Sequence, residues 1–433
     1  MKTQHIHMVG IGGIGMSALA QLFLAQGAEI SGCDRGESPT TELLRAKGIS
    51  VSVGHEEAHI TSETTLLIYS DAIPADNPER VKAREQGIEE LSYFAALGRA
   101  AEGKRVIAVA GTHGKTTTTA MIGKMLIDAG EDPTVVVGSI VTDFKSNYRE
   151  GKSDIFVVEA CEYRRHFLNF HPKVLVITNI ELDHTDYFRD LADVESAFAE
   201  SVATVEDGGV VIADPTSASV IAAIAKATAP VVDYVQESVP TLKLPGEFNR
   251  ENARAAKAAV RALVPGIVEE VLDQSLESFH GTWRRFEYKG QLPHDAMLYD
   301  DYAHQPTAIR RTILAAKEKF PDKRIAVVFH PHLYSRTRDL FDDFAASLAL
   351  VDEAYVLPIY AAREEPDPAV SHESLAEAVN QVGGHAQALA DLDEATRVLA
   401  ALPKDVVAFT MGAGDVYRAG EAALLLSIET ATQ

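Results

Sequence analysis

Cysteine is scarce in this chain, and no apolar run approaches the length of a membrane helix. Cys33 and Cys161 are the two cysteines among 433 residues; they lie far apart and form no CxxC pair. A disulfide framework and a structural zinc site are therefore not expected, and a reducing cytoplasm is the expected location. The N-terminal residues show no charged stretch followed by a long apolar run, so we expect neither secretion nor a membrane span.

Positive charge is also in short supply. There are 40 Lys and Arg residues against 63 Asp and Glu residues, which gives a formal net charge of −23. This acidic balance argues against a non-specific binder of nucleic acid or of anionic membranes, so any anionic ligand must be held by local donors. Apolar residues make up 46% of the chain, a content typical of a globular protein.

Short β-branched runs alternate with longer amphipathic segments along the whole chain. This alternation predicts an α/β fold built from βαβ units with largely parallel sheets. Three such series can be separated, and they predict domains at residues 1–103, 104–281 and 282–433. The expected strands are 5–9, 28–33 and 66–70 in the first series, 105–110, 155–159 and 174–179 in the second, and 297–301, 324–329, 353–357 and 406–410 in the third.

A glycine-rich turn joins the first expected strand to a helix. Its glycines are Gly10, Gly12, Gly13 and Gly15, and Asp34 ends the next expected strand. Glycines let the backbone approach a pyrophosphate at a helix N-terminus, and the carboxylate can accept a hydrogen bond from a ribose. Taken alone, this pattern indicates NAD. UDP-sugars carry the same pyrophosphate and ribose, and a turn without a ligand would show the same glycines.

A second glycine turn follows the strand expected at 105–110. Lys115 can reach terminal phosphates, Thr116 can bind Mg²⁺, and successive backbone N–H groups can surround the anion. Val109 stands where the full GxxxxGK[ST] pattern has glycine, so the loop is a shortened variant. The sequence therefore predicts ATP as the ligand of this loop. The loop residues are Gly111, Thr112, His113, Gly114, Lys115, Thr116 and Thr117.

Polar residues follow two further strands of the second series. Glu159 ends the strand at 155–159, and His184 follows the strand at 174–179. Open α/β sheets hold ligands at the carboxyl ends of their strands, and Mg²⁺ prefers oxygen donors such as Thr116 and Glu159. His184 is a less typical magnesium ligand and would indicate a second site. On spacing alone, either residue could instead be a loop residue paired with a neighbouring cation.

The segment 55–59 matches the HExxH pattern of zinc proteases. His55 and His59 lie in a segment rich in turn residues rather than on a long apolar helix, and no third ligand is evident. We therefore do not expect zinc-protease chemistry. The chain also lacks a GxSxG motif, so a hydrolase triad gains no support.

Several short polar motifs in the last part of the chain complete a pattern that resembles the Mur ligase family over nearly all residues. Within that family, the resemblance is greatest to the members that attach L-alanine to UDP-N-acetylmuramate. It implies an N-terminal Rossmann-like UDP-binding domain, a central P-loop ATPase-like domain and a mobile C-terminal Rossmann-like domain. The segments that carry it are GIGGIGMS (10–17), SGCD (31–34), AIPADNPE (72–79), AGTHGKTTTT (110–119), EACEYRRHFL (159–168), TNIELDH (178–184), PGEFNREN (245–252), RRF (284–286), DDYAH (300–304), PHLYSRTRDL (331–340) and MGAGD (411–415).

The resemblance also implies a reaction and residue roles. The implied reaction is ATP-dependent ligation of L-alanine to UDP-N-acetylmuramate through an acyl phosphate, in peptidoglycan precursor synthesis, with Mg²⁺ as cofactor and a monomer or homodimer as the assembly. The UDP interpretation of the first glycine turn then replaces NAD. The implied catalytic residues are Lys115, Glu159, His184, Arg285, His332 and Arg336. ATP binding is implied for residues 111–117, Asn249, Asn252, Arg285 and Asp301; UDP-substrate binding for Gly10, Gly12, Gly13, Gly15, Asp34 and Ser70; the amino-acid side for His304, His332 and Arg336; and metal binding for Thr116, Glu159 and His184.

The chain departs from the family pattern at several positions that bear on its alanine and substrate contacts. Gln305 and His330 stand where a His and a Gln are usual, Asp71 replaces a Ser, and the segment 214–245 is shorter than its family counterpart. The alternatives are a family member that attaches a murein tripeptide, a nicotinamide-dependent oxidoreductase, and a nucleotide-binding regulator without catalysis.

Overall fold

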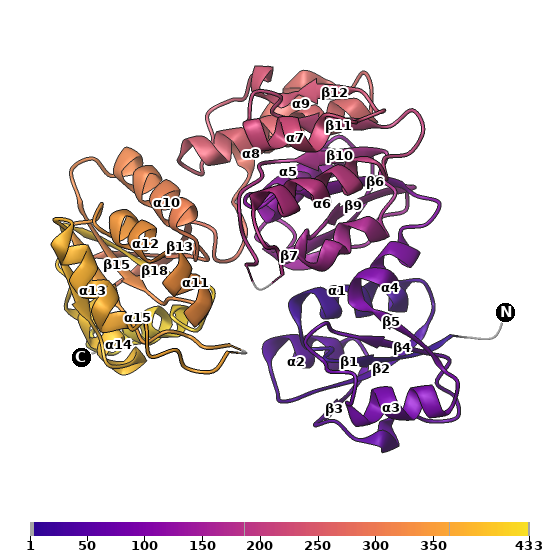
Figure 1. Ribbon diagram of the computed structural model, residues 1–433, viewed down its shortest axis with the longest axis horizontal. Helices are drawn as coiled ribbons and strands as arrows, with labels where there is room; N and C mark the ends of the chain where they lie inside the picture. The colour runs from indigo at the N-terminus through magenta and orange to yellow at the C-terminus, as the bar shows by residue number, and fades with distance from the viewer. Residues whose placement is uncertain (1–3, 186, 363, 432–433) are drawn as a thin grey trace. The chain divides into compact units, whose positions relative to one another are not determined.

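The computed structural model describes residues 4–185, 187–362 and 364–431, and the chain divides into two compact units (Figure 1). The first unit comprises Met1–Thr241 with Glu251–Phe279, and the second comprises Leu242–Arg250 with His280–Gln433. The first unit contains two sheets and the second contains one. No helix in the described part of the chain combines the length and the apolar character needed to cross a bilayer.

A five-stranded parallel sheet, in the order β3-β2-β1-β4-β5, forms the N-terminal part of the first unit. Its central strands bury side chains on both faces because helices cover both faces. Helices α1 and α4 pack on the face that carries Ile6 and Met8, whereas α3 packs on the face that carries Val9 and Cys33. The elements are β1 (His5–Val9), α1 (Ile14–Ala25), β2 (Glu29–Asp34), α2 (Pro39–Ala46), β3 (Ser50–Val53), the 3₁₀ helix η1 (Glu57–His59), β4 (Leu66–Tyr69), α3 (Pro78–Glu85), β5 (Glu89–Ser92) and α4 (Tyr93–Ala100).

A seven-stranded sheet, in the order β12-β11-β10-β6-β9-β7-β8, forms the rest of the first unit. Its strands are parallel except for the antiparallel pair β7–β8. Helices α6 and α7 cover one face, while α5 packs on β6, β7 and β9 and contacts α9. The elements are β6 (Arg105–Ala110), α5 (Lys115–Asp128), β7 (Thr134–Val141), β8 (Ser146–Arg149), β9 (Ile155–Glu159), η2 (Tyr163–Asn169), β10 (Val174–Ile177), α6 (Leu191–Val202), β11 (Val210–Ala213), α7 (Ala218–Ile224), β12 (Val231–Asp233), η3 (Tyr234–Gln236), α8 (Glu247–Leu263) and α9 (Glu269–Ser278).

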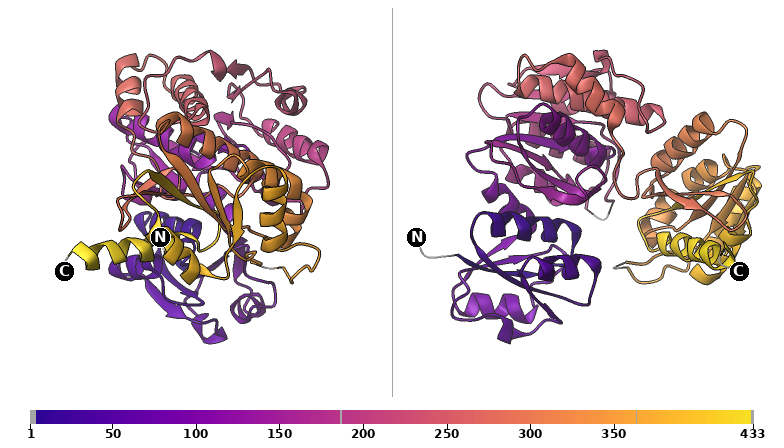
Figure 2. Two further views of the ribbon diagram at one scale, coloured as in Figure 1. Left: turned by 90° about the vertical axis from the view of Figure 1, so that its left-hand side faces the viewer. Right: turned by 180° about the vertical axis from the view of Figure 1, so that it is seen from behind.

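The second unit is a six-stranded sheet in the order β13-β14-β18-β15-β16-β17, with β13 antiparallel to β14 and the other pairs parallel. Helices α10, α12 and α13 cover one face, and α14 and α15 cover the other (Figure 2). The elements are β13 (Glu287–Gln291), β14 (Met297–Asp301), α10 (Pro306–Lys319), β15 (Arg324–Phe329), α11 (Tyr334–Asp339), α12 (Phe341–Leu348), β16 (Glu353–Val356), α13 (His372–Gln381), β17 (Ala386–Ala388), α14 (Leu392–Ala401), β18 (Val406–Met411) and α15 (Tyr417–Ala431).

These three sheets confirm the α/β fold class that the alternating pattern predicts. The strands expected at 105–110, 155–159 and 324–329 agree at both ends with β6, β9 and β15. The carboxyl ends of the parallel strands bring the polar motifs of the sequence to the edges of the sheets, where open α/β folds bind ligands.

Candidate functional site

The second glycine turn connects β6 to α5 at the carboxyl edge of the seven-stranded sheet. Gly111 and Gly114 have φ angles of +135° and +84°, which residues other than glycine rarely adopt. A Cβ atom on Gly111 would lie 2.0 Å from Thr178 Oγ1, and one on Gly114 would lie 2.2 Å from Asn252 Oδ1. Both the backbone conformation and the space therefore require glycine in this loop.

The strand end after β10 holds the loop in place through hydrogen bonds. The Thr178 hydroxyl donates to the His113 carbonyl oxygen at 2.5 Å, and the His113 N–H donates to Asn179 Oδ1 at 2.9 Å. The Glu181 N–H donates to Thr112 Oγ1 at 2.9 Å. A loop that is fixed by its neighbours presents its N–H groups to a phosphate at a lower entropic cost.

Lys115 forms a buried ion pair with Glu162. Its Nζ lies 2.9 Å from Glu162 Oε2 and 3.1 Å from Oε1, and the glutamate side chain is only 2% exposed. Burial alone would lower the pKa of Lys115, but the attraction of the Glu162 carboxylate outweighs it, so the pKa lies above its ordinary value. The ammonium group is therefore charged at neutral pH, as phosphate binding requires.

Glu162 lies in the site but was not among the residues predicted for it. It lies within EACEYRRHFL, a segment that carries the family resemblance, three residues after Glu159, which ends β9. The sequence signal that could have pointed to Glu162 was a second carboxylate close to the end of the same strand. The signal was weak, because an acidic residue in a loop is more often a solvated charge.

The predicted metal-binding residues lie at this same edge. The Thr116 hydroxyl donates to Glu159 Oε1 at 2.9 Å, and the Gly138 N–H donates to Glu159 Oε2 at 2.8 Å. His184 has a positive φ of 53°, and its Nε2 lies 3.8 Å from Glu162 Oε1. The structure thus places Thr116 against Glu159, and His184 beside Glu162. Adjacent hydroxyl and carboxylate oxygens are the donors that Mg²⁺ prefers.

The first glycine turn lies at the carboxyl edge of the five-stranded sheet. The Gly12 N–H donates to Asp34 Oδ2 at 2.9 Å, which holds the carboxylate next to the start of α1. A Cβ atom on Gly15 would lie 2.7 Å from the ring of Tyr93, a contact residue that the sequence did not single out. The structure gathers the predicted residues of this site: Gly10, Gly12, Gly13, Gly15, Asp34 and Ser70.

Asp301 in the second unit orders the segment that carries Arg285. Its carboxylate accepts hydrogen bonds from the N–H groups of Phe286 and Ala303, both at 2.8 Å. Burial raises the pKa of Asp301, and the nearby charge of Arg285 and the two N–H groups offset part of the effect. The Arg285 guanidinium lies 5.1 Å from the centre of the Tyr302 ring. Arg285 and Asp301 are therefore neighbours, as their common assignment to ATP requires.

Three residues predicted for the amino-acid side meet at the ends of β14 and β15 in the second unit. The rings of His304 and His332 are 6.4 Å apart between centres, and Arg336 Nη1 lies 3.4 Å from His332 Nδ1. The His332 ring stacks on Tyr360 at 5.5 Å. A cationic group and two imidazoles in one place can bind a carboxylate and exchange a proton.

The two asparagines predicted at the adenine both lie on α8, but in different compact units. Asn252 belongs to the first unit and contacts Gly114 of the phosphate loop. Asn249 belongs to the second unit, where its Nδ2 donates to the Pro245 carbonyl oxygen at 2.7 Å. Within the first unit, the structure therefore brings Asn252 to the phosphate loop.

The positions that depart from the family pattern have defined surroundings. Asp71 Oδ2 lies 3.7 Å from His166 Nε2, so the imidazole ring of His166 lies beside this carboxylate. His330 packs edge-on against Tyr360 at 5.5 Å between centres, and burial lowers its pKa to about 4. Gln305 is buried and precedes the first turn of α10.

Comparison with known proteins agrees with these motifs. Residues 5–105 match the Mur ligase family catalytic domain, residues 109–241 the Mur ligase middle domain, and residues 284–414 the Mur ligase glutamate ligase domain. A UDP-N-acetylmuramate--L-alanine ligase from Clostridium botulinum is 36% identical to this chain, and one from Clostridium acetobutylicum is 37% identical; each comparison covers 97% of both chains.

A solved structure extends this similarity to the whole fold. The crystal structure of UDP-N-acetylmuramate-alanine ligase from Thermotoga maritima matches with a TM-score of 0.82 and 28% sequence identity. The match covers 98% of this chain and 99% of that one. Because the identity with the clostridial ligases extends over nearly every residue and all three domain matches agree, the chain belongs to the Mur ligase family.

Proposed function

We propose that this Mur ligase joins L-alanine to UDP-N-acetylmuramate and converts ATP to ADP and phosphate. The observation that carries the proposal is the identity of 36–37% with UDP-N-acetylmuramate--L-alanine ligases over 97% of the chain. That similarity includes the phosphate loop of the first unit and the polar strand ends of the second. It favours the ligase over a nicotinamide-dependent oxidoreductase and over a regulator without catalysis.

The reaction needs ATP because a carboxylate does not acylate an amine directly. In the proposed sequence, an oxygen of the muramyl carboxylate attacks the γ-phosphorus of ATP, and ADP leaves. The alanine nitrogen then attacks the acyl carbon of the resulting acyl phosphate. The bond between the acyl carbon and oxygen breaks, phosphate leaves, and the nitrogen loses a proton as the amide forms.

Lys115 and the phosphate loop supply the electrostatic part of this reaction. The charged Nζ lies at the N-terminus of α5, where the helix dipole also favours negative charge. Both effects stabilise the charge that spreads over the transferring phosphoryl group. The rigid loop fixes the direction of approach, because its glycines and the strand end 178–181 leave it little freedom.

The proposed metal ligands fit Mg²⁺. Thr116 and Glu159 would hold one ion, since their oxygens lie 2.9 Å apart and Gly138 fixes the second carboxylate oxygen. His184, with Glu162, would hold a second. When bound, Mg²⁺ neutralises charge on the phosphates.

The remaining roles follow the sequence assignments. The first glycine turn, with Asp34 and Ser70, would hold the UDP moiety. Arg285 would contact phosphates, and Asp301 a ribose. Asn249 and Asn252 would lie at the adenine, and the group His304, His332 and Arg336 would receive alanine. We also retain the domain boundaries 1–103, 104–281 and 282–433, a monomer or homodimer, and a cytoplasmic location as parts of the proposal.

Phosphate release tests the function directly. Purified protein is given ATP and Mg²⁺, with and without UDP-N-acetylmuramate, and each of L-alanine, glycine, L-serine and a murein tripeptide as acceptor. We expect release that depends on UDP-N-acetylmuramate and is fastest with L-alanine. Release that requires the tripeptide would assign the chain to the peptide-attaching ligases, and no release with any acceptor would refute ligase activity.

A further inference from the structure

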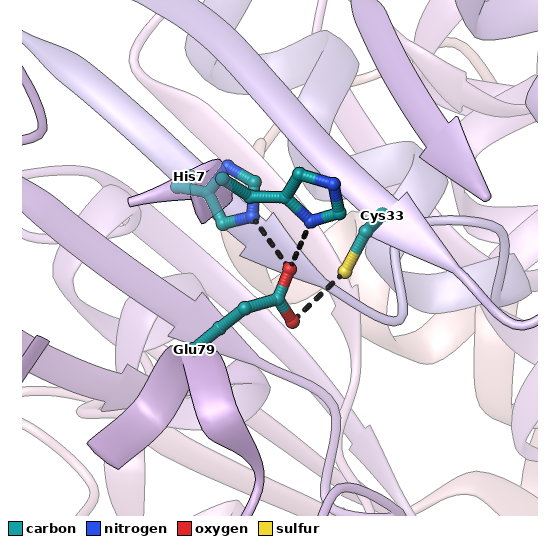
Figure 3. Close-up of side chains that lie close together, drawn as sticks. His7, Cys33 and Glu79 are labelled. Atoms are coloured by element: carbon teal, nitrogen blue, oxygen red, sulfur yellow. Dashed lines mark hydrogen bonds and ion pairs between the residues drawn. The ribbon is translucent and has the colours of Figure 1, made fainter. Parts of the chain in front are cut away.

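Five side chains that can bind metals, and that the proposed reaction does not use, converge beside the N-terminal sheet. We call them the N-terminal cluster: His7, Cys33, His55, His59 and Glu79. His7 lies on β1, Cys33 on β2 and Glu79 in the first turn of α3, and their side chains point toward one another (Figure 3). The cluster lies on the sheet face covered by α3.

The distances within the cluster suit a four-coordinate ion. One ligand atom each from His7, Cys33, His59 and Glu79 lies within 4.8 Å of all the others. Cys33 Sγ is 3.1 Å from Glu79 Oε2, and His59 Nδ1 is 2.6 Å from Glu79 Oε1. A tetrahedral zinc ion with bonds of about 2.0–2.3 Å holds its ligand atoms about 3.3–3.8 Å apart. Small side-chain rotations would bring these atoms to that spacing.

The charges in the cluster call for a cation. The Glu79 side chain is 0% exposed, and a buried carboxylate requires compensation. Among the described residues, its ion-pair partners are all histidines, while the adjacent Arg80 pairs with Glu90 instead. One thiolate, one carboxylate and two neutral imidazoles together balance the charge of one divalent ion.

The environment of His7 independently indicates that the cluster holds a cation. Its side chain is 3% exposed, and Nδ1 lies 2.8 Å from the Ser31 hydroxyl. Nε2 is buried and has no hydrogen-bond partner in the described part of the chain; Glu79 Oε1 lies 3.4 Å away. A histidine that binds a metal through one nitrogen commonly donates a hydrogen bond from the other, which orients the ring. Ser31 can accept such a bond and leave the Nε2 lone pair directed into the cluster.

We propose that the N-terminal cluster binds a zinc ion. Thiolate and imidazole ligands favour zinc over magnesium or calcium, which prefer oxygen donors alone. The ligand set is His7, Cys33, His59 and Glu79, with His55 on the more exposed side, 3.1 Å from Cys33 Sγ. The fold thus brings further possible ligands to the HExxH segment, and the proposal departs from the expectation of no structural zinc site.

The site is structural rather than hydrolytic. The carboxylates between the two histidines, Glu56 and Glu57, are exposed, so neither can serve as a base beside the ion. Four protein ligands also close a tetrahedral site, whereas catalytic zinc keeps a position open for water. The carbonyl oxygen of Cys33 accepts hydrogen bonds from the N–H groups of Gly10 and Ile11, at 2.9 Å and 3.0 Å. Zinc therefore fixes the strand that supports the first glycine turn.

Cobalt is a useful probe because thiolate ligation gives Co²⁺ an intense near-ultraviolet charge-transfer band. The full-length protein, freed of metal by a chelator, is titrated with Co²⁺ and then with Zn²⁺. We expect a thiolate band that saturates at one equivalent of Co²⁺ and disappears when Zn²⁺ displaces it. Cys33→Ser should abolish the band, whereas Cys161→Ser, which changes the other cysteine, should retain it.

A second pair of variants tests the histidine ligands. We expect His7→Gln to weaken zinc binding by more than the roughly 10–100-fold typical of losing an outer hydrogen-bond partner. His5→Gln is the matched control, because His5 lies on the same strand but pairs with Glu29. It should leave the affinity unchanged. Circular dichroism of each variant identifies any that fails to fold.

Two results would overturn the proposal: a wild-type protein that gives no thiolate band with Co²⁺, or a band that persists in Cys33→Ser. Either result would mean that bound protons, and not a metal ion, hold the side chains of the cluster together. These titrations contain neither ATP nor UDP-N-acetylmuramate. A failure of the ligase proposal would therefore leave the zinc result intact, and a failure of the zinc proposal would leave the ligase result intact.

Discussion

Replacing Lys115 by methionine separates its part in catalysis from its part in folding. Methionine keeps an unbranched chain but removes the charge that lies 2.9 Å from Glu162. Loss of one preorganised electrostatic group typically lowers turnover by about 10²–10³-fold. Removal of one partner from a buried ion pair costs about 3–5 kcal/mol of stability, because the remaining charge is left buried. Both losses are expected here, since the Glu162 side chain is almost fully enclosed.

A second substitution tells the two losses apart. In Lys115→Met/Glu162→Gln no unpaired carboxylate remains, so urea unfolding should show most of the lost stability restored. Phosphate release at saturating substrate should stay about 10²-fold or more below wild type, because the cation at the phosphates is still missing and Glu162 no longer helps to hold the second Mg²⁺. Lys124→Met is the matched control on the same helix; its pair with Asp128 is worth at most about 1 kcal/mol.

Turnover near the wild-type value in Lys115→Met would refute the assignment of Lys115 to the phosphates. An unchanged free energy of unfolding in the same variant would refute the argument from the buried pair. Recovery of turnover in the double variant would show that Lys115 acts only by neutralising Glu162.

Three further changes probe separate parts of the structure. Glu159→Gln can still accept the hydrogen bond from Thr116 but loses its charge, so the Mg²⁺ concentration at half-maximal rate should rise at least about tenfold; an unchanged Mg²⁺ titration would argue against metal binding. Gly15→Ala places a Cβ 2.7 Å from the Tyr93 ring, so KM for UDP-N-acetylmuramate should rise while KM for ATP stays constant. Burial lowers the pKa of His330 from 6.5 to about 4, so the unfolded chain binds more protons between these values and wild-type stability falls as the pH is lowered through them. Between pH 7 and pH 4, the free energy of unfolding of His330→Gln in urea should therefore fall by up to about 3 kcal/mol less than that of wild type. Equal losses in the two proteins would contradict a neutral buried imidazole.

The innermost strands of each sheet were predicted from the sequence, whereas the edge strands, and β7 and β11 next to the edges of the seven-stranded sheet, were not. β6 is buried over nearly its whole length, so its residues form a continuous apolar run. β3 has exposed ends and alternates serine with valine, and β17 has only three residues. Such short, partly exposed strands are defined by pairing with a neighbour rather than by their own composition.

The two glycine turns could be predicted because each is a local motif, but the residues that contact them come from distant segments. Lys115 and Thr116 are adjacent to the glycines that position them. Glu162 and Asn252 contact the same loop from other elements, and no spacing in the sequence relates them to it. The N-terminal cluster shows the same limit more strongly, since Cys33 and Glu79 are 46 residues apart and meet only when α3 covers the sheet face that carries Cys33.

The alternation of side chains along β2 explains how one strand can contribute to two proposed sites. Successive residues in a strand point to opposite faces, so Cys33 and Asp34 cannot share a site although they are neighbours in sequence. Asp34 accepts the Gly12 N–H at the start of α1, whereas Cys33 lies on the face of α3. Parallel pairing places Val9 opposite Cys33, so β1 ends at this level and its glycine turn begins there. The proposed metal at Cys33 would therefore act on the glycine turn through the backbone of β2, from the sheet face opposite Asp34.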